Sequence, residues 1–296
     1  MDDTVSIAIH SGKQEYFPLI ENLIKSFLVC NEYPNIELLL IESAGNHKIR
    51  EWFSSIDING CFVNFDGTMT SITKNKNVLI EKTLLFLDFS DDVPWYVCYM
   101  DSLKRAIDAS AGKYFVFLAE DNQFMIKGNV IGDYIIMLSN LGEESHMINF
   151  SAMQCYKYVK PNNLHGAVRN IGGVKYFPIE NVKWDPTYFC DKKIYEKLGD
   201  FVFGDEGDPH RTINNFIEMS KKLKLSRAYK AIPCSIWFHN EHKDNYIKMI
   251  QKRTAINPDY ILFGIDSLKE TRRLMGAFPY RPIGTDDWHH KIREPV

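Results

Sequence analysis

Residues 114–122 join an uninterrupted apolar run to two adjacent carboxylates, and this feature most constrains the fold. The run Tyr-Phe-Val-Phe-Leu is aromatic or branched throughout, which is typical of a strand buried on both faces. Glu120 and Asp121 follow almost at once. Strands of this kind belong mainly to parallel sheets, which bind ligands beyond the carboxyl ends of their strands. The sequence therefore predicts an α/β fold with an acidic site at the end of this strand.

Similar short apolar runs alternate with helical periodicity in the first part of the chain. Strands are predicted at residues 5–11, 36–42 and 61–65, and helices at residues 16–30 and around 49–53. This alternation favours a parallel sheet with right-handed crossovers.

The later elements are less regular. Residues 68–94 are interpreted as a helix plus a loop, and residues 95–111 as a helix that Gly112 ends as a C-terminal cap. We further expect helices at 130–141, 191–198 and 212–223, strands at 147–158 and 228–238, and a loop-rich segment with a hairpin at 159–187.

The chain has 296 residues, of which 45% are hydrophobic and 25% charged, enough for a substantial core. We expect one domain over residues 1–240 and a helical or irregular C-terminal extension over 241–296 packed on it. The net charge of -3 does not favour nucleic acid as a partner.

The cellular compartment of the protein is predicted from sequence patterns that are absent. The six cysteines show no CxxC pair and no zinc-like spacing, so reduced thiols are expected. The N-terminus resembles no signal peptide, and no apolar run reaches the roughly 20 residues of a membrane span. These features predict a cytoplasmic protein with at most peripheral membrane contact.

Two motifs resemble those of GT-A glycosyltransferases of the family 2 type. GKYFVFLAED at residues 112–121 resembles the family's G-x-Y-(I/V)-x-F-L-D-x-D, and IESAG at 41–45 resembles its V-D-D-G-S. In layout the resemblance spans roughly residues 5–240. It implies a GT-A (nucleotide-diphospho-sugar transferase) fold with a mostly parallel central sheet flanked by helices.

The resemblance also implies an activity. Such enzymes move a sugar from a nucleoside diphosphate sugar, with a UDP-sugar favoured, to an acceptor hydroxyl with inversion. The acceptor would be a saccharide or a lipid-linked molecule in polysaccharide or glycoconjugate synthesis.

A divalent cation is expected at the acidic strand end, because carboxylates can hold a cation that bridges to phosphate. By resemblance, Asp121 ligates Mn²⁺ or Mg²⁺ and His239 completes the metal shell. Ala119 replaces the first acid of the family motif, and Glu120 could supply its contact by a small shift of the loop. The alternatives are a plain strand-ending turn for the acids and a packed or solvated side chain for His239.

The donor site is expected around the ends of neighbouring strands. By resemblance, Glu42 accepts a hydrogen bond from the nucleotide base, and Ser11 lies where the first strand meets the same pocket. Asp66 is a weaker candidate, and Lys104 with Arg105 could approach the diphosphate. The alternatives are a helix N-cap or loop solvation for the polar residues and a solvated helix face for the cations.

A second acidic loop, FGDEGD at residues 203–208, resembles the family's F-G-E-D-x-D segment. Glu206 matches the base that deprotonates the acceptor hydroxyl, and Asp205 and Asp208 are close rivals. An exposed turn is the alternative.

Other classes fit less well. There is no GxGxxG and no GxxxxGK(S/T), and Ser11-Gly12-Lys13 is a poor match to the first loop of a sugar-phosphate nucleotidyltransferase. A non-catalytic nucleotide- or sugar-binding relic of the same fold remains an alternative because of Ala119. A cluster of basic residues could rest on anionic lipid or keep the surface soluble: Lys221, Lys222, Lys224, Arg227 and Lys230.

Overall fold

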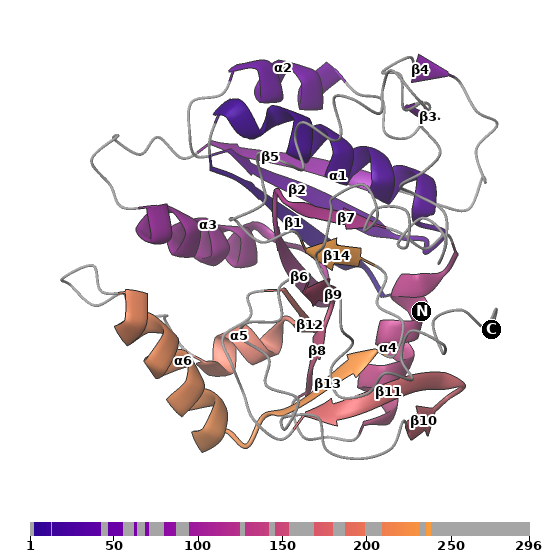
Figure 1. The fold of residues 1–296 in the computed structure, drawn as a ribbon, viewed down its shortest axis with the longest axis vertical. Helices are drawn as coiled ribbons and strands as arrows, with labels where there is room; N and C mark the ends of the chain where they lie inside the picture. Colours follow the sequence, from indigo (N-terminus) through magenta and orange to yellow (C-terminus); the bar gives the residue numbers. More distant parts are fainter. Residues whose placement is uncertain are drawn as a thin grey trace, which may run out of the picture.

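The computed structural model describes residues 3–12, 14–42, 47–55, 62–63, 69–70, 80–86, 95–124, 128–141, 146–153, 169–179, 187–198, 209–230 and 235–237. Within them, strands and helices form a layered α/β fold (Figure 1). The predicted α/β class is confirmed. Asp66, the acidic loop 203–208, His239 and the extension 241–296 lie outside the described residues, so the predictions made for them stay predictions.

A nine-stranded sheet forms the centre, in the order β10-β11-β13-β8-β12-β6-β1-β2-β5. Its parallel half pairs β5, β2, β1 and β6. Beyond β6, β8 and β13 keep the same direction, whereas β12 and β11 run against it. The bounds are β1 Val5–Ser11, β2 Ile36–Glu42, β5 Ile80–Phe86, β6 Tyr114–Ala119, β8 His146–Asn149, β10 Arg169–Ile171, β11 Val174–Ile179, β12 Tyr188–Asp191 and β13 Ser226–Lys230.

Two smaller sheets accompany the central one. β3 (Phe62–Val63) pairs with β4 (Met69–Thr70), and β14 (Ser235–Trp237) lies between β7 (Asn122–Phe124) and β9 (Ser151–Met153). The second of these joins segments that are far apart in the sequence.

Helices cover both faces of the central sheet, as Figure 1 shows. One face carries α1 (Phe17–Cys30, preceded by the 3-10 turn η1 Gln14–Tyr16), α2 (His47–Ser55) and α4 (Val130–Asn140). The other carries α3 (Trp95–Ala109), α5 (Lys193–Leu198) and α6 (Pro209–Lys222). Ile7 and Ile9 pack toward the first face and Ala8 toward the second, because successive side chains of a strand alternate. Both cores therefore need apolar residues, which explains why these strands are mostly apolar.

Aromatic rings pack the three-stranded sheet β7-β14-β9 against the core on the α1, α2 and α4 side of the central sheet. Phe124 of β7 packs edge-on against Phe27 of α1, with ring centroids 5.2 Å apart, and against Phe150 at 5.7 Å. Phe150 also contacts Tyr134, whose hydroxyl donates to the Phe150 carbonyl oxygen at 2.9 Å. These contacts fix β7 against the main fold.

A buried polar network connects the amino ends of neighbouring central strands. Ser6 Oγ donates to Glu37 Oε2 at 2.5 Å, and the same carboxylate oxygen accepts from the amide of Ala111 at 2.9 Å. The amide of Gly112 donates to Ser6 Oγ at 2.9 Å. The network joins β1, β2 and the approach to β6.

Gly112 was expected to cap α3, but α3 ends at Ala109, three residues earlier. A side chain at Gly112 would collide with Ser6 Oγ and come within 2.7 Å of the Ser6 amide nitrogen and 2.9 Å of the Thr4 carbonyl oxygen. The position needs glycine because the backbone at Gly112 approaches residues 4–6 closely, not because a helix ends.

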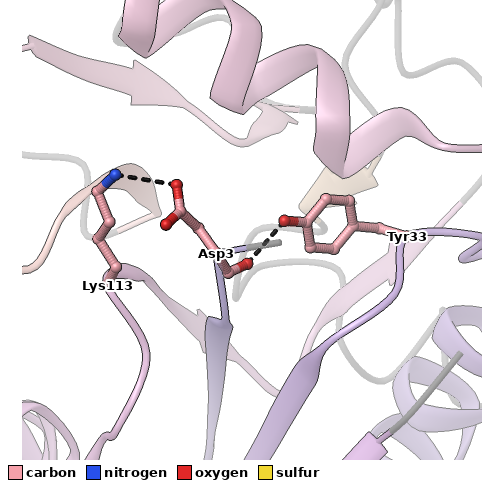
Figure 2. Close-up of polar contacts among 3 residues, drawn as sticks. All are labelled: Asp3, Tyr33 and Lys113. Atoms are coloured by element: carbon pink, nitrogen blue, oxygen red, sulfur yellow. Dashed lines mark hydrogen bonds and ion pairs between the residues drawn. The ribbon is translucent and has the colours of Figure 1, made fainter. Parts of the chain in front are cut away.

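Asp3 stabilises the start of β1 from two sides (Figure 2). Its carboxylate bonds Lys113 Nζ at 2.9 Å, and its carbonyl oxygen accepts from the Tyr33 hydroxyl at 2.7 Å. The hydrogen bond to Asp3 raises the pKa of Lys113 above its ordinary value, so the ammonium stays charged. These bonds link the beginnings of β1, β2 and β6.

The interpretation of residues 68–94 as helix plus loop was wrong, because they contain strand β5. β5, and not the segment 61–65, is the third parallel strand, and β3 pairs only with β4 in a separate sheet. Short apolar runs such as Thr-Leu-Leu-Phe do not distinguish a helix from a buried strand by periodicity.

Two predicted strands proved to be two strands each. Residues 147–158 contain β8 and β9, and residues 228–238 contain the end of β13 and β14, with the members of each pair in different sheets. Strand β12 was not predicted at all, although helix α5 that follows it was. Within the described residues, none of the helices is long and apolar enough to cross a membrane.

Cys190 of β12 lies in the core between the central sheet and helices α3, α5 and α6. It is a free cysteine and fully buried. Burial, together with the charge of Asp191, raises the pKa of its thiol well above the ordinary value. The thiol therefore stays neutral and packs as a small apolar side chain.

Replacing Gly112 with alanine is expected to lower the free energy of unfolding by about 1–3 kcal/mol, the usual cost of overpacking. Chemical denaturation followed by circular dichroism measures this. The matched control is Ala111→Ser at the neighbouring exposed position, which should change stability by less than about 0.5 kcal/mol. Equal stability of Gly112→Ala and the parent protein would contradict the close approach.

Candidate functional site

The order of the central strands reverses between β1 and β6. From β1 the chain continues to β2 and β5 on one side of β1, and it then returns through α3 to β6 on the other side. Open α/β sheets bind their ligands outside the carboxyl ends of the strands at such a reversal. The candidate site is therefore the carboxyl edge of β1, β2 and β6.

Strand register brings predicted residues together at this edge. Ser11 is paired with Glu42, and His10 is paired with Ala119, directly before Glu120 and Asp121. Because neighbouring strands lie about 4.8 Å apart, all four predicted polar residues meet at one edge.

The acidic turn is buried. Glu120 is 4% exposed and Asp121 is 0% exposed, and Asn122 Nδ2 closes the turn by donating to the Ala119 carbonyl oxygen at 2.9 Å. Burying adjacent carboxylates is costly unless cations or hydrogen-bond donors stabilise them. A plain strand-ending turn would normally leave such side chains in water, so burial favours a binding role.

Strand β14 runs beside this turn. Its last residue, Trp237, is paired with Asn122, the residue directly after Asp121. His239, the predicted metal ligand, comes two residues after Trp237 and falls beyond the described part of the chain. The pairing brings the strand that leads to His239 next to the acidic turn.

Helix α1 holds the far end of β7 in place. Ser26 Oγ accepts from the Phe124 amide at 3.0 Å and donates to the Leu23 carbonyl oxygen at 2.8 Å. Since β7 begins directly after Asp121, this bond restricts where the acidic turn can lie.

Glu42 ends β2 with its side chain fully buried and ion-paired to Arg50 of α2. Arg50 Nε and Nη2 each lie 2.7 Å from Glu42 Oε2. Sequence analysis did not single out Arg50. Arg50 follows Glu42 by eight residues, and this spacing matches no recognisable motif, so the sequence carried no usable signal.

His10 was also missed. It is 6% exposed, its ring packs edge-on against Tyr99 of α3 at 5.2 Å, and a side chain at Gly12 would come within 2.9 Å of its Cε1 atom. The imidazole therefore packs close over Gly12, where the chain leaves β1.

The predicted cations of α3 lie farther from this edge. Tyr99 contacts His10 near the carboxyl end of β1, and Lys104 follows five residues later, about 7.5 Å along a helix that runs toward the start of β6. Arg105 is 58% exposed and pairs with Asp101 at 2.8 Å, which is the solvated helix face that was the alternative. A diphosphate role for Lys104 stays a prediction.

The acidic turn fits part of a metal site. Glu120 and Asp121 offer the carboxylate oxygens that Mg²⁺ and Mn²⁺ prefer. Among the residues that the structure describes, no group of three metal-ligating side chains occurs. A complete site would need a further ligand from the rest of the chain, such as His239.

Among solved structures, the chain is similar to TarS of S. aureus, with a TM-score of 0.49 and 9% identity over 86% of this chain and 40% of that one. It is similar to the glycosyltransferase GlyE of Streptococcus pneumoniae, with a TM-score of 0.47 and 11% identity over 88% of this chain and 62% of that one.

A third similar structure is described as a glucose-1-phosphate thymidylyltransferase of Bacillus anthracis in complex with sucrose. Its TM-score is 0.44, with 11% identity over 86% of this chain and 95% of that one. No protein-family model matches the chain. The chain spans less than two thirds of TarS and of GlyE. All three TM-scores lie below 0.5, so these likenesses carry no argument about function.

Replacing Ser26 with alanine is expected to destabilise the protein by about 1–3 kcal/mol, because the buried Phe124 amide loses its acceptor. Thermal and urea unfolding measure the change. Ser55→Ala is the matched control, since Ser55 also donates to the carbonyl oxygen three residues earlier but is exposed. A loss no larger than that of Ser55→Ala would show that the bond does not hold β7.

Proposed function

We propose that the protein is a metal-dependent glycosyltransferase that moves a sugar from a nucleoside diphosphate sugar to an acceptor hydroxyl with inversion. The observation that carries the proposal is the buried acidic turn, Glu120-Asp121, beside β1 where the strand order reverses. Acids placed there suit a cation that bridges to a diphosphate.

In the proposed mechanism, Asp121 and His239 would hold Mn²⁺ or Mg²⁺. Glu120 would make the ribose or metal-water contact that belongs to the first acid of the family motif and that Ala119 cannot make. The bound cation would neutralise charge on the departing diphosphate. Ser11 and the Glu42 region bind the nucleoside. Each of these assignments follows the motif resemblance, and the common edge of Ser11, Glu42, Glu120 and Asp121 supports it.

Transfer needs a base on the face of the sugar opposite the leaving group. We assign this role to Glu206, with Asp205 and Asp208 as rivals in the same loop. The carboxylate takes the proton of the acceptor hydroxyl while the acceptor oxygen bonds to the anomeric carbon. The bond from that carbon to the phosphate oxygen breaks, and the nucleoside diphosphate leaves with the electron pair.

The acceptor is proposed to be a saccharide or a lipid-linked molecule. Of the basic cluster, Lys221, Lys222 and Lys224 are exposed and suit an anionic surface. Arg227 does not belong to that surface, because it is 3% exposed and its guanidinium packs on the ring of Tyr188. Any membrane contact would be peripheral.

The two alternatives, a non-catalytic binding protein and a sugar-phosphate nucleotidyltransferase, are separated by products. Incubating the protein with a panel of nucleotide sugars and Mn²⁺ should release nucleoside diphosphate slowly. A binding protein would show affinity without release. A nucleotidyltransferase would instead form nucleotide sugar from a nucleoside triphosphate and a sugar phosphate.

Replacing Asp121 with asparagine is expected to weaken Mn²⁺-dependent UDP binding at least tenfold, because an amide is a much poorer ligand for a hard divalent cation. Isothermal titration calorimetry with and without Mn²⁺ measures this. Asp101→Asn on the solvated face of α3 is the control and should bind like the parent protein. Unchanged affinity of Asp121→Asn would remove Asp121 from the metal site.

Replacing Glu206 with glutamine is expected to leave donor binding intact and to lower transfer at least a hundredfold, in line with the usual contribution of a general base. Donor affinity by calorimetry and product formation by chromatography give the two readouts. Asp205→Asn and Asp208→Asn are made in parallel. Full turnover of Glu206→Gln, with loss in one of the other two variants, would move the base to that residue.

A further inference from the structure

The two residues of the ion pair at the end of β2 differ in solvent exposure. Glu42 is completely buried, whereas the Arg50 side chain keeps 21% of its surface exposed. Both nitrogens of one guanidinium edge, Nε and Nη2, lie 2.7 Å from the same carboxylate oxygen. At this end of the strands, part of the Arg50 side chain reaches the surface, whereas the Glu42 side chain does not.

The geometry of a guanidinium gives Arg50 a second direction of contact. Arginine carries five N–H groups in a rigid planar fork, and Glu42 engages the Nε side of that fork. The Nη1 side therefore points away from Glu42. By bonding the Nε and Nη2 edge of the guanidinium, the buried Glu42 carboxylate fixes the direction of the Nη1 side. In this arrangement Glu42 is a positioning residue for Arg50.

The position of the pair suits one part of a nucleotide. β2 lies two strands away from β6, with β1 between them, so the pair is about 10 Å from the strand that ends in the acidic turn. This distance is of the order of the length of a nucleoside. A nucleotide with its phosphates at Asp121 would extend across Ser11 and bring its base to Arg50.

We propose that Arg50, held by Glu42, binds the nucleobase and selects bases with a keto group, namely uracil, thymine or guanine. This inference rests on the proposed function, because it presumes a nucleoside diphosphate at the edge. It also revises the expected role of Glu42, which becomes the positioning residue for Arg50 instead of the direct base contact.

The selectivity follows from donors and acceptors. A guanidinium only donates, so it pairs well with the O4 atom of uracil and thymine or with the O6 and N7 atoms of guanine. Cytosine and adenine carry an amino group at the corresponding position, which would place donor against donor. A site that is built to donate to a keto oxygen rejects such analogues, because its buried polar groups lose their partner.

The test is binding of UDP, GDP, CDP and ADP to the 296-residue chain in the presence of Mn²⁺, by isothermal titration calorimetry. The parent protein should prefer UDP or GDP over CDP and ADP by about tenfold or more. Arg50→Lys should lower that preference to less than about threefold, because an ammonium can still pair with Glu42 but lacks the planar fork. Arg105→Lys, in the exposed pair with Asp101, is the matched control and should keep the full preference.

Glu42→Gln tests the positioning role through the same ratio of affinities, which a loss of stability alone would not change. It should lower the preference as Arg50→Lys does. Equal binding of all four nucleotides to the parent protein, or an unchanged preference in Arg50→Lys, would overturn the inference and leave the glycosyltransferase proposal standing. Binding of none of the four would overturn both. The comparison in the parent protein needs no variant to fold.

Discussion

Parallel pairing of β1 with both β2 and β6 is the constraint on which the rest depends. It sets Ser11 beside Glu42 and puts the acidic turn one strand away, so residues from three separate segments share one edge. The pairing is stable because both faces of these strands are covered, by α1 and α2 on one side and by α3 on the other. The apolar strand interiors thus determine where the polar strand ends meet.

The opposite edge of the sheet is closed by polar contacts of another kind. Glu37, Ser6 and Gly112 form a buried network, and Asp3 joins Lys113 and Tyr33 nearby. These bonds connect the starts of the strands whose ends carry the candidate site. Structural polar groups therefore lie at the amino ends of the central strands, and candidate binding groups lie at their carboxyl ends.

The sequence predicted the parts of this arrangement that depend on local pattern. β1, β2 and β6 were predicted because most of their residues are apolar, and their ends located Ser11, Glu42 and Asp121. β5 and β12 escaped because a short apolar run has no decisive period. Arg50 and His10 escaped for a different reason: their roles come from contacts with Glu42 and Tyr99, which only the folded chain creates.

The three-stranded sheet β7-β14-β9 can be completed only after most of the described chain has been synthesised. Its strands come from residues near 122, 151 and 235, so the ladder beside Asp121 stays incomplete until nearly the whole described chain has left the ribosome. Contacts of such long sequence separation form slowly, because the intervening chain must be ordered first. A nascent chain ending before residue 235 contains the residues of β1, β2 and β6 but lacks β14, the strand that flanks the acidic turn. Completion of the ladder beside the acidic turn therefore waits until residues 235–237 have been synthesised.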